Sequence, residues 1–248
     1  MRTIALFTFV ILAFSMGSFA QTARPKSTGA PDKVDGASVD TVSLELAKAA
    51  LAAHGGDKLK AMKSLLVKGS IDMNVMGQTM PGAFSTAFSG DKYFFELISP
   101  AQQLKQVYNG EQTYSSVQGF SLPPVTSLGF PVLAKIGDAG YIISAPGDGK
   151  KKGKGFRVTT PEGFYTDFFV DKKTKQVKSF ESAYDMGGGR VVTTSVAMDE
   201  FELVSGVLVP KNYSQRFDLG TLTAYAHFKA KSILINSPID SGAFAMAK

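Results

Sequence analysis

The clearest pattern of polar and apolar residues lies at positions 164–184, where it predicts a long antiparallel hairpin. Residues 164–170 and 177–184 alternate between polar and apolar side chains, and Asp-Lys-Lys-Thr-Lys-Gln at 171–176 forms the turn between them. Because successive side chains of a strand point to opposite faces, this period of two gives the hairpin one aromatic face. We expect Phe168, Phe180 and Tyr184 on that face, and a register shift of one residue would turn all three outward.

Similar segments recur on both sides of this hairpin and predict about ten to twelve strands joined by short turns. The first of them alternates from Leu65 to Val75, and Asn109-Gly110 is a strong hairpin signal between two later ones. The expected strands cover residues 65–75, 84–88, 93–97, 104–108, 112–118, 141–144, 156–170, 177–184, 191–198, 201–204, 207–217 and 221–235.

Strands that follow one another through short turns form one large antiparallel sheet, and a sheet of this size twists and curls toward a barrel. The predicted fold class is therefore mainly β (α+β), with a single large curved antiparallel sheet. No Pro- or Gly-rich linker divides residues 65–235, so we interpret residues 40–248 as one domain.

An amphipathic helix is predicted before the sheet. Asp40 or Ser43 can cap its start, and Gly55-Gly56 allows the left-handed backbone that ends many helices. Asp57 then caps a shorter helix that extends to residue 62. The first helix needs an apolar partner, because one side of it carries a stripe formed by Leu44, Ala47, Ala50 and Leu51.

The alternating pattern is interrupted at residues 119–140. This segment contains too much proline for the interior of a sheet and is too apolar for an ordinary exposed loop. We interpret it as a Pro-rich apolar lid, built as a pair of short helices over one face of the sheet. The apolar side of this lid is predicted to consist of Phe120, Leu122, Leu128, Phe130 and Leu133.

Residues 1–20 have the pattern of a cleaved signal peptide. Arg2 precedes an apolar run over residues 4–14, and Ser18 and Ala20 place small residues before the expected cleavage point. Residues 21–39, which are rich in Pro, Gly, Ser and charge, predict a flexible arm. The chain has no cysteine, so neither a disulfide nor a cysteine-linked lipid anchor is expected. We therefore expect an exported, soluble, periplasmic protein.

The formal net charge of the 248-residue chain is +6, and its basic residues cluster at 150–157 and 172–178. These clusters are interpreted either as solvated loops or as sites of transient contact with anionic headgroups or an acidic envelope protein. Nucleic acid is not expected as a partner, because no recognisable binding motif accompanies the charge.

Candidate catalytic chemistry is sparse. The chain has no Gly-x-Ser-x-Gly motif and no cysteine nucleophile. His54 lies at a predicted helix end, where a positive charge is favourable, and His227 falls on the polar face of a predicted strand. Two distant histidines without cysteine do not predict a zinc site. We therefore expect no enzyme, no metal and no cofactor, and interpret the acidic group at 199–202 as a polar rim.

Several turns and strand ends resemble those of the LolA-like periplasmic proteins, which sort outer-membrane lipoproteins, and of their lipid-binding relatives. They are Gly55-Gly56, the strand after Lys63-Ser64, Val-Asp-Lys-Lys-Thr at 170–174, Ser-Gly-Val-Leu-Val-Pro at 205–210, and Ile-Asn-Ser-Pro-Ile-Asp at 235–240 with Phe244. The resemblance implies an unclosed barrel whose helical lid covers a cavity for acyl chains. It also implies an arginine that holds the lid closed, for which Arg157, Arg190 and Arg216 are candidates without a matching motif.

The aromatic stripes suit either a packed core or the wall of such a cavity, since nineteen Phe and eight Tyr occur without Trp. Our leading hypothesis is a monomeric, non-enzymatic carrier or binder of lipids or lipoprotein acyl chains. The alternatives are a structural or interaction module of a cell-envelope complex and, third, a hydrolase. The predicted cavity wall consists of Val67, Ile71, Met73, Phe84, Phe88, Tyr93, Phe95, Leu97, Phe156, Phe168, Phe180 and Tyr184.

Overall fold

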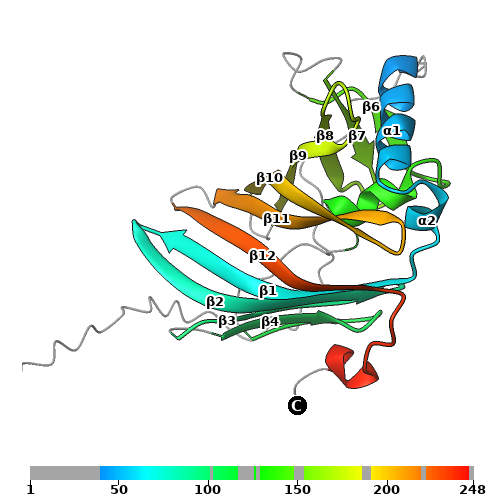
Figure 1. Ribbon diagram of the computed structural model, residues 1–248. Helices are drawn as coiled ribbons and strands as arrows, with labels where there is room; N and C mark the ends of the chain where they lie inside the picture. Colours follow the sequence, from blue (N-terminus) through cyan, green and yellow to red (C-terminus); the bar gives the residue numbers. More distant parts are fainter. Residues whose placement is uncertain are drawn as a thin grey trace, which may run out of the picture.

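The computed structural model describes residues 40–100, 103–116, 126, 129–147, 154–185, 191–218 and 222–245. Within these residues the chain forms a twelve-stranded antiparallel sheet in the order β5-β4-β3-β2-β1-β12-β11-β10-β9-β8-β7-β6. Each strand pairs with its neighbours in sequence, except that β5 and β6 do not pair with each other and form the two edges of the sheet. In addition, the first strand, β1, pairs with the last, β12. The sheet is strongly curved and does not close (Figure 1).

This arrangement confirms the predicted fold class and the open sheet implied by the LolA-like resemblance. The predicted hairpin is present as β8 and β9. The elements are α1 (Thr41–Ala53), α2 (Asp57–Lys60), β1 (Ser64–Val75), β2 (Gln78–Ser89), β3 (Lys92–Ile98), β4 (Gln103–Tyr108), β5 (Thr113–Ser115), η1 (Phe130–Lys135), β6 (Ile142–Ser144), β7 (Gly155–Thr159), β8 (Tyr165–Val170), β9 (Val177–Asp185), β10 (Val191–Val204), β11 (Val207–Asp218), β12 (Thr223–Ile235) and η3 (Ser241–Phe244).

Cross-strand register places a continuous series of apolar side chains from the long strands on one concave face. Phe168 pairs with Phe180, and Phe180 pairs in turn with Val196 of β10. At the other side of the sheet Phe88 lies between Leu65 and Tyr93. Because residues directly opposite each other share a face, these pairs form one continuous apolar surface, and the predicted register of the hairpin is confirmed.

The helices cover part of this concave face. In α1 the Asp40 carboxylate accepts a hydrogen bond from the backbone N–H of Ser43 (3.2 Å), which confirms the predicted cap. The apolar side of α1 packs on β6, β7 and η1, as Figure 1 shows. The second cap was predicted wrongly, because Gly56 precedes α2 and Asp57 is its first residue.

The lid segment is described only in part. Its described portion contains η1, a 3₁₀ helix with Pro131 at its start, where a missing N–H is tolerated. Phe130 and Leu133 are buried on the concave face of the sheet. The predicted lid residues Phe120, Leu122 and Leu128 lie outside the described residues, as do the predicted signal peptide and flexible arm at 1–39.

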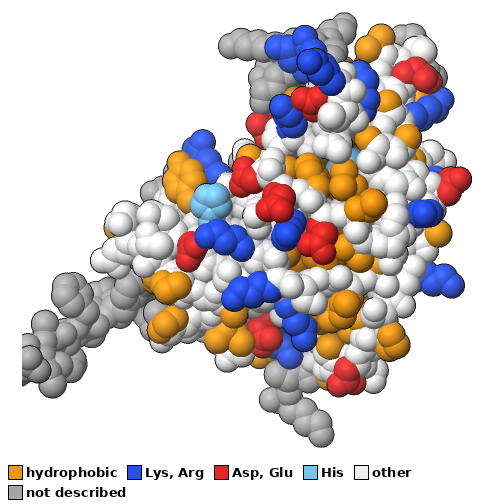
Figure 2. Space-filling model, viewed as in Figure 1, with side chains coloured by type: hydrophobic (Ala, Val, Ile, Leu, Met, Phe, Trp, Pro, Cys, Tyr) orange, Lys and Arg blue, Asp and Glu red, His pale blue; other side chains and the backbone are white. Residues whose placement is uncertain are grey.

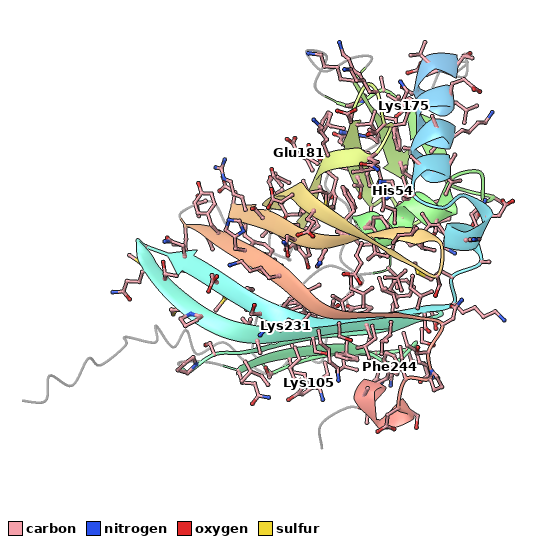
Figure 3. The ribbon with its side chains drawn as sticks, viewed as in Figure 1. His54, Lys105, Lys175, Glu181, Lys231 and Phe244 are labelled. Carbon is pink, nitrogen blue, oxygen red and sulfur yellow. The ribbon has the colours of Figure 1, made fainter. Side chains whose placement is uncertain are left out.

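The C-terminal segment covers part of the opposite, convex face. Phe244 of η3 packs edge-on against Phe94 of β3, with ring centroids 5.9 Å apart. Ala87 and Val107 complete this small cluster. Figure 3 shows Phe244 beneath the sheet, on the side away from α1. The described part of the molecule therefore buries apolar side chains on both faces of β2 to β4.

Candidate ligand-binding cavity

The concave face is not filled completely. A cavity of about 370 Å³ lies between η1 and the strands on both sides of the β1–β12 pairing. Its walls come from β1 to β4 and from β9 to β12, and Gly129, Phe130 and Pro131 cover it. Ligand pockets in proteins span about 300–1,000 Å³ and are mostly apolar, so this cavity has the size and lining of a small-molecule site.

All twelve residues of the predicted cavity wall lie on the concave face, but they divide into two groups. Eight line the cavity, namely Val67, Ile71, Met73, Phe88, Phe95, Leu97, Phe180 and Tyr184. Phe156 and Phe168 do not, because they are fully buried and stack on each other with centroids 5.2 Å apart. Phe84 packs edge-on against Phe228, and Tyr93 stacks on Tyr108.

Of the two described lid residues, Phe130 lines the cavity, whereas Leu133 is buried away from it. The lining also includes residues that our sequence reasoning missed, most of them on β10 to β12. The period of two in these strands is the signal that could have identified the apolar ones. The missed residues of these three strands are Thr194, Val196, Met198, Val209, Pro210, Tyr213, Gln215, Phe217, Ala224, Ala226 and Phe228.

The lining residues along β1 and its partner β12 are more exposed near the end of β1 than at its start. Leu65, at the start of β1, is buried, whereas Met73, near its end, is half-buried. Phe217 and Ala224 are paired with each other beside the end of β1, and both are half-buried as well. An apolar chain that enters beside the end of β1 would therefore extend toward its start.

A row of polar side chains crosses four neighbouring strands on this face. Thr166 of β8 and Ser182 of β9 share a hydrogen bond of 3.1 Å between their hydroxyl oxygens. Ser182 pairs across the sheet with Thr194 of β10, whose hydroxyl accepts a hydrogen bond of 2.8 Å from the Gln215 side-chain amide of β11. We call these four residues the polar row; all but Thr166 line the cavity.

The cavity lining contains no charged side chain among the described residues. Two tyrosines, Tyr184 and Tyr213, are among the lining residues, and burial raises the pKa of both side chains. Their side chains therefore stay neutral at physiological pH. The charged residues of the same strands, including Glu181 and Arg216, occupy the alternate positions that face outward.

The 3₁₀ helix η1 is joined to the cavity wall at its first turn. The backbone N–H of Gly129 donates a hydrogen bond of 3.1 Å to the hydroxyl of Thr166. Gly129 has φ 74° and ψ −148°, a backbone conformation that is close to exclusive to glycine. A Cβ atom at this position would lie 2.8 Å from the ring of Phe180. The position of η1 over the cavity thus depends on a glycine.

His54 joins α1 to the sheet. It lies at the end of α1, as predicted, but the expectation of a positive charge there is wrong. The side chain is fully buried between the end of α1 and the strands (Figure 3). Its Nδ1–H donates to the carbonyl of Leu208 (2.8 Å), and its Nε2 accepts from the N–H of Val177 (3.0 Å). Because it is desolvated, the pKa of His54 is lowered, and only the neutral ring can make both hydrogen bonds.

Among the described residues, the side-chain ion-pair partners of the strand arginines lie on the strands and not on η1. Arg157 forms a two-pronged ion pair with Asp167 on the adjacent strand (2.7 and 2.8 Å) and lies over the ring of Tyr165. Arg216 pairs with Asp218 on the outer face, and Arg190 lies outside the described residues. Figure 2 shows acidic and basic side chains mixed over the outer surface of the sheet. We therefore assign no lid-closing arginine.

The basic turn at residues 171–176 joins β8 to β9, at the opposite end of β9 from the cavity-lining Tyr184. Lys175 lies on the upper rim in the view of Figure 3. Asp171 accepts backbone hydrogen bonds within this turn and pairs with Lys178 (3.1 Å). The basic turn therefore lies at the start of β9, whereas the accessible end of the cavity lies near the end of β9.

One cluster on the outer face contains the side-chain types of a hydrolase. The hydroxyl of Ser214 donates to Asp199 (3.2 Å) and lies 3.2 Å from Nδ1 of His227. The serine is therefore between the acid and the imidazole, whereas a catalytic triad places the imidazole in the middle. This geometry does not support nucleophilic catalysis. Within the described residues, no group of three or more His, Asp or Glu side chains could hold a metal ion.

Comparisons with known proteins show that this chain is similar in fold to several solved structures. No family model and no curated protein matches the chain. A DUF1329 family protein from Desulfovibrio piger is 12% identical, with a TM-score of 0.50 over 83% of this chain and 96% of that one. At this level of identity the likeness concerns the fold alone. No helix within the described residues is long and apolar enough to cross a membrane.

Two further solved structures are similar at lower TM-scores. A domain assigned to outer-membrane lipoprotein sorting from Vibrio parahaemolyticus is 8% identical, with a TM-score of 0.44 over 82% of this chain and 95% of that one. A LolA superfamily protein from Nitrosomonas europaea is 11% identical, with a TM-score of 0.45 over 78% of this chain and 96% of that one.

Proposed function

We propose that this protein is a non-enzymatic carrier that binds acyl chains of lipids or lipoproteins in the cavity on its concave face. The observation that carries the proposal is the cavity itself, which has an apolar lining without a charged residue and a size typical of ligand sites. An interaction module does not need an apolar space of this kind, and a hydrolase would need catalytic groups beside it, whereas the Ser214 cluster lies on the outer face.

The energetics of apolar burial explain how a site without ionic contacts can hold a lipid. An acyl chain of about fifteen methylenes gains about 12 kcal/mol on burial, at about 0.8 kcal/mol for each methylene. Association costs roughly 4–15 kcal/mol in lost freedom of motion. Burial of one or two chains therefore offsets this cost without a charged anchor, which agrees with the composition of the lining.

Filling the cavity tests the proposal. Ala226 points into the cavity from β12, and we expect Ala226→Trp to abolish uptake of a fluorescent acyl lipid because its ring occupies the space of the chain. The matched control is Ala197→Trp, which adds the same side chain at an exposed position of β10. Equal uptake by both variants would refute the cavity as the binding site.

Export to the periplasm belongs to the same proposal and is supported by the signal-peptide pattern of residues 1–20. We expect the mature chain in the periplasmic fraction of its host, with its N-terminus near residue 21. Retention of the unprocessed chain in the cytosol would contradict the proposed localisation and leave the cavity without access to lipoproteins.

A further inference from the structure

We propose that the cavity selects uncharged, ester-linked acyl lipids over free fatty acids, and that the polar row receives the ester or glycerol part of the ligand. This inference rests on the proposed function and specifies its ligand. It follows from two features of the lining, the absence of any charged side chain among the described residues and the place of the polar row within a mostly apolar surface.

The first feature disfavours an anionic ligand head. A carboxylate moved out of water without a counter-ion loses its hydration, which is far more costly than burial of a neutral polar group. The charged residues Glu181 and Arg216 lie on the outward face of β9 and β11. A free fatty acid would therefore keep its carboxylate at the accessible end and bury less of its chain, whereas an ester can enter completely.

The second feature supplies partners for a neutral head. Within the described residues the Thr194 hydroxyl accepts from Gln215 but has no acceptor for its own proton, and the Gln215 side-chain carbonyl has no donor. One free donor and one free acceptor, both neutral, therefore lie side by side in the lining. An ester carbonyl accepts from the first and a glycerol hydroxyl donates to the second.

The place of these groups along the cavity fits an ester at the head of a chain. Thr194 pairs with Phe217, which pairs with Ala224, and this row lies beside the end of β1, where the cavity is more accessible. The opposite end, lined by Leu65, Phe88 and Val209, is apolar and buried. An acyl chain that points toward the buried end leaves its ester group beside Thr194 and Gln215.

The test compares two ligands that carry the same chain. Oleic acid, which is anionic at pH 7.5, and monoolein, its uncharged glycerol ester, are titrated against the full mature protein by displacement of the neutral dye Nile red. We expect monoolein to bind at least about tenfold more tightly. Equal or tighter binding of oleate would overturn the inference while the proposed function stands. Failure of both ligands to bind would overturn both.

Three variants assign the effect to the polar row. We expect Thr194→Val to weaken monoolein binding about five- to tenfold. The matched control Thr193→Val, the same change on the exposed face of β10, should leave it unchanged. Gln215→Lys adds a cation and should reverse the preference toward oleate. If Thr194→Val and Thr193→Val bind monoolein equally, the polar row does not receive the head.

One further ligand comparison identifies the source of the ester. A synthetic diacylglyceryl-cysteine peptide presents the same ester groups as a lipoprotein anchor, and monoolein presents them as a free lipid. Binding of either glyceride more tightly than oleate supports the inference, and the tighter of the two identifies the source. Preference for oleate over both would overturn it.

Discussion

At the scale of single residues, the two histidines have opposite environments. His54 is fully buried and hydrogen-bonded at both ring nitrogens, to Leu208 and Val177. Its ring also packs edge-on against Phe130 of η1, with centroids 5.5 Å apart. His227 is exposed on the outer face of β12. One neutral imidazole thus connects α1, β9, β11 and the helix that covers the cavity.

We predict that stability depends on the protonation of His54. Its pKa is lowered from 6.5 in the folded protein, so the unfolded chain binds the proton first as the pH falls. The contribution of neutral His54 to the free energy of unfolding is therefore complete above about pH 6.5 and is lost progressively as the pH falls below that value. Urea unfolding at pH 7.5 and at pH 5.5 should show a lower free energy of unfolding at pH 5.5.

The control for this prediction uses both histidines. His227→Asn should keep the pH dependence of the wild type. His54→Leu should remove most of it and lower the free energy of unfolding at pH 7.5, by about 1–3 kcal/mol for each buried partner left unpaired. A wild-type pH dependence in His54→Leu would show that another group titrates in this range.

At the scale of elements, the position of η1 decides how much of the concave face stays open. Thr166 accepts a hydrogen bond from the residue that precedes η1, and the ring of Phe180 lies directly against that residue. The wall and the cover of the cavity therefore meet at Gly129. Any side chain there would have to move Phe180, which itself lines the cavity.

We predict that Gly129→Ala weakens lipid binding and lowers the free energy of unfolding by about 1–3 kcal/mol, because its backbone conformation is unfavourable for alanine. The matched control is Gly90→Ala, since Gly90 also has a positive φ (60°) but has open space where a Cβ atom would lie. Both variants are assayed by urea unfolding and by uptake of a fluorescent lipid. Unchanged uptake in Gly129→Ala would contradict the assigned role of the contact with Phe180.

The period of two predicted most of the strands and the face of every predicted wall residue, because alternation directly reports which side of a strand is buried. The alternation did not separate packed aromatic residues such as Phe156 from cavity-lining ones such as Phe180, because both kinds lie on the same face of the sheet. It also gave no sign of the polar row, because Thr194 and Gln215 interrupt the apolar pattern. Only the pairing of strands brings these residues together.

At the scale of the whole molecule, an open sheet of twelve strands has more concave surface than its described helices cover. α1 and η1 cover the face near β6 and β7, and the cavity occupies the part that remains. The packing of Phe244 on the convex face was not predicted from the sequence, because η3 lies far from β3 in the chain. A fold of this shape is compatible with the proposed carrier function, in which an apolar ligand is held and then released.

The central claim is that the cavity holds an acyl lipid. The most direct measurement is native mass spectrometry of the mature protein purified from its host without detergent. We predict a mass increase that corresponds to one or two acyl chains, and loss of this increase in Ala226→Trp but not in Ala197→Trp. Ligand-free protein in every preparation, together with no uptake of added lipid, would contradict the claim.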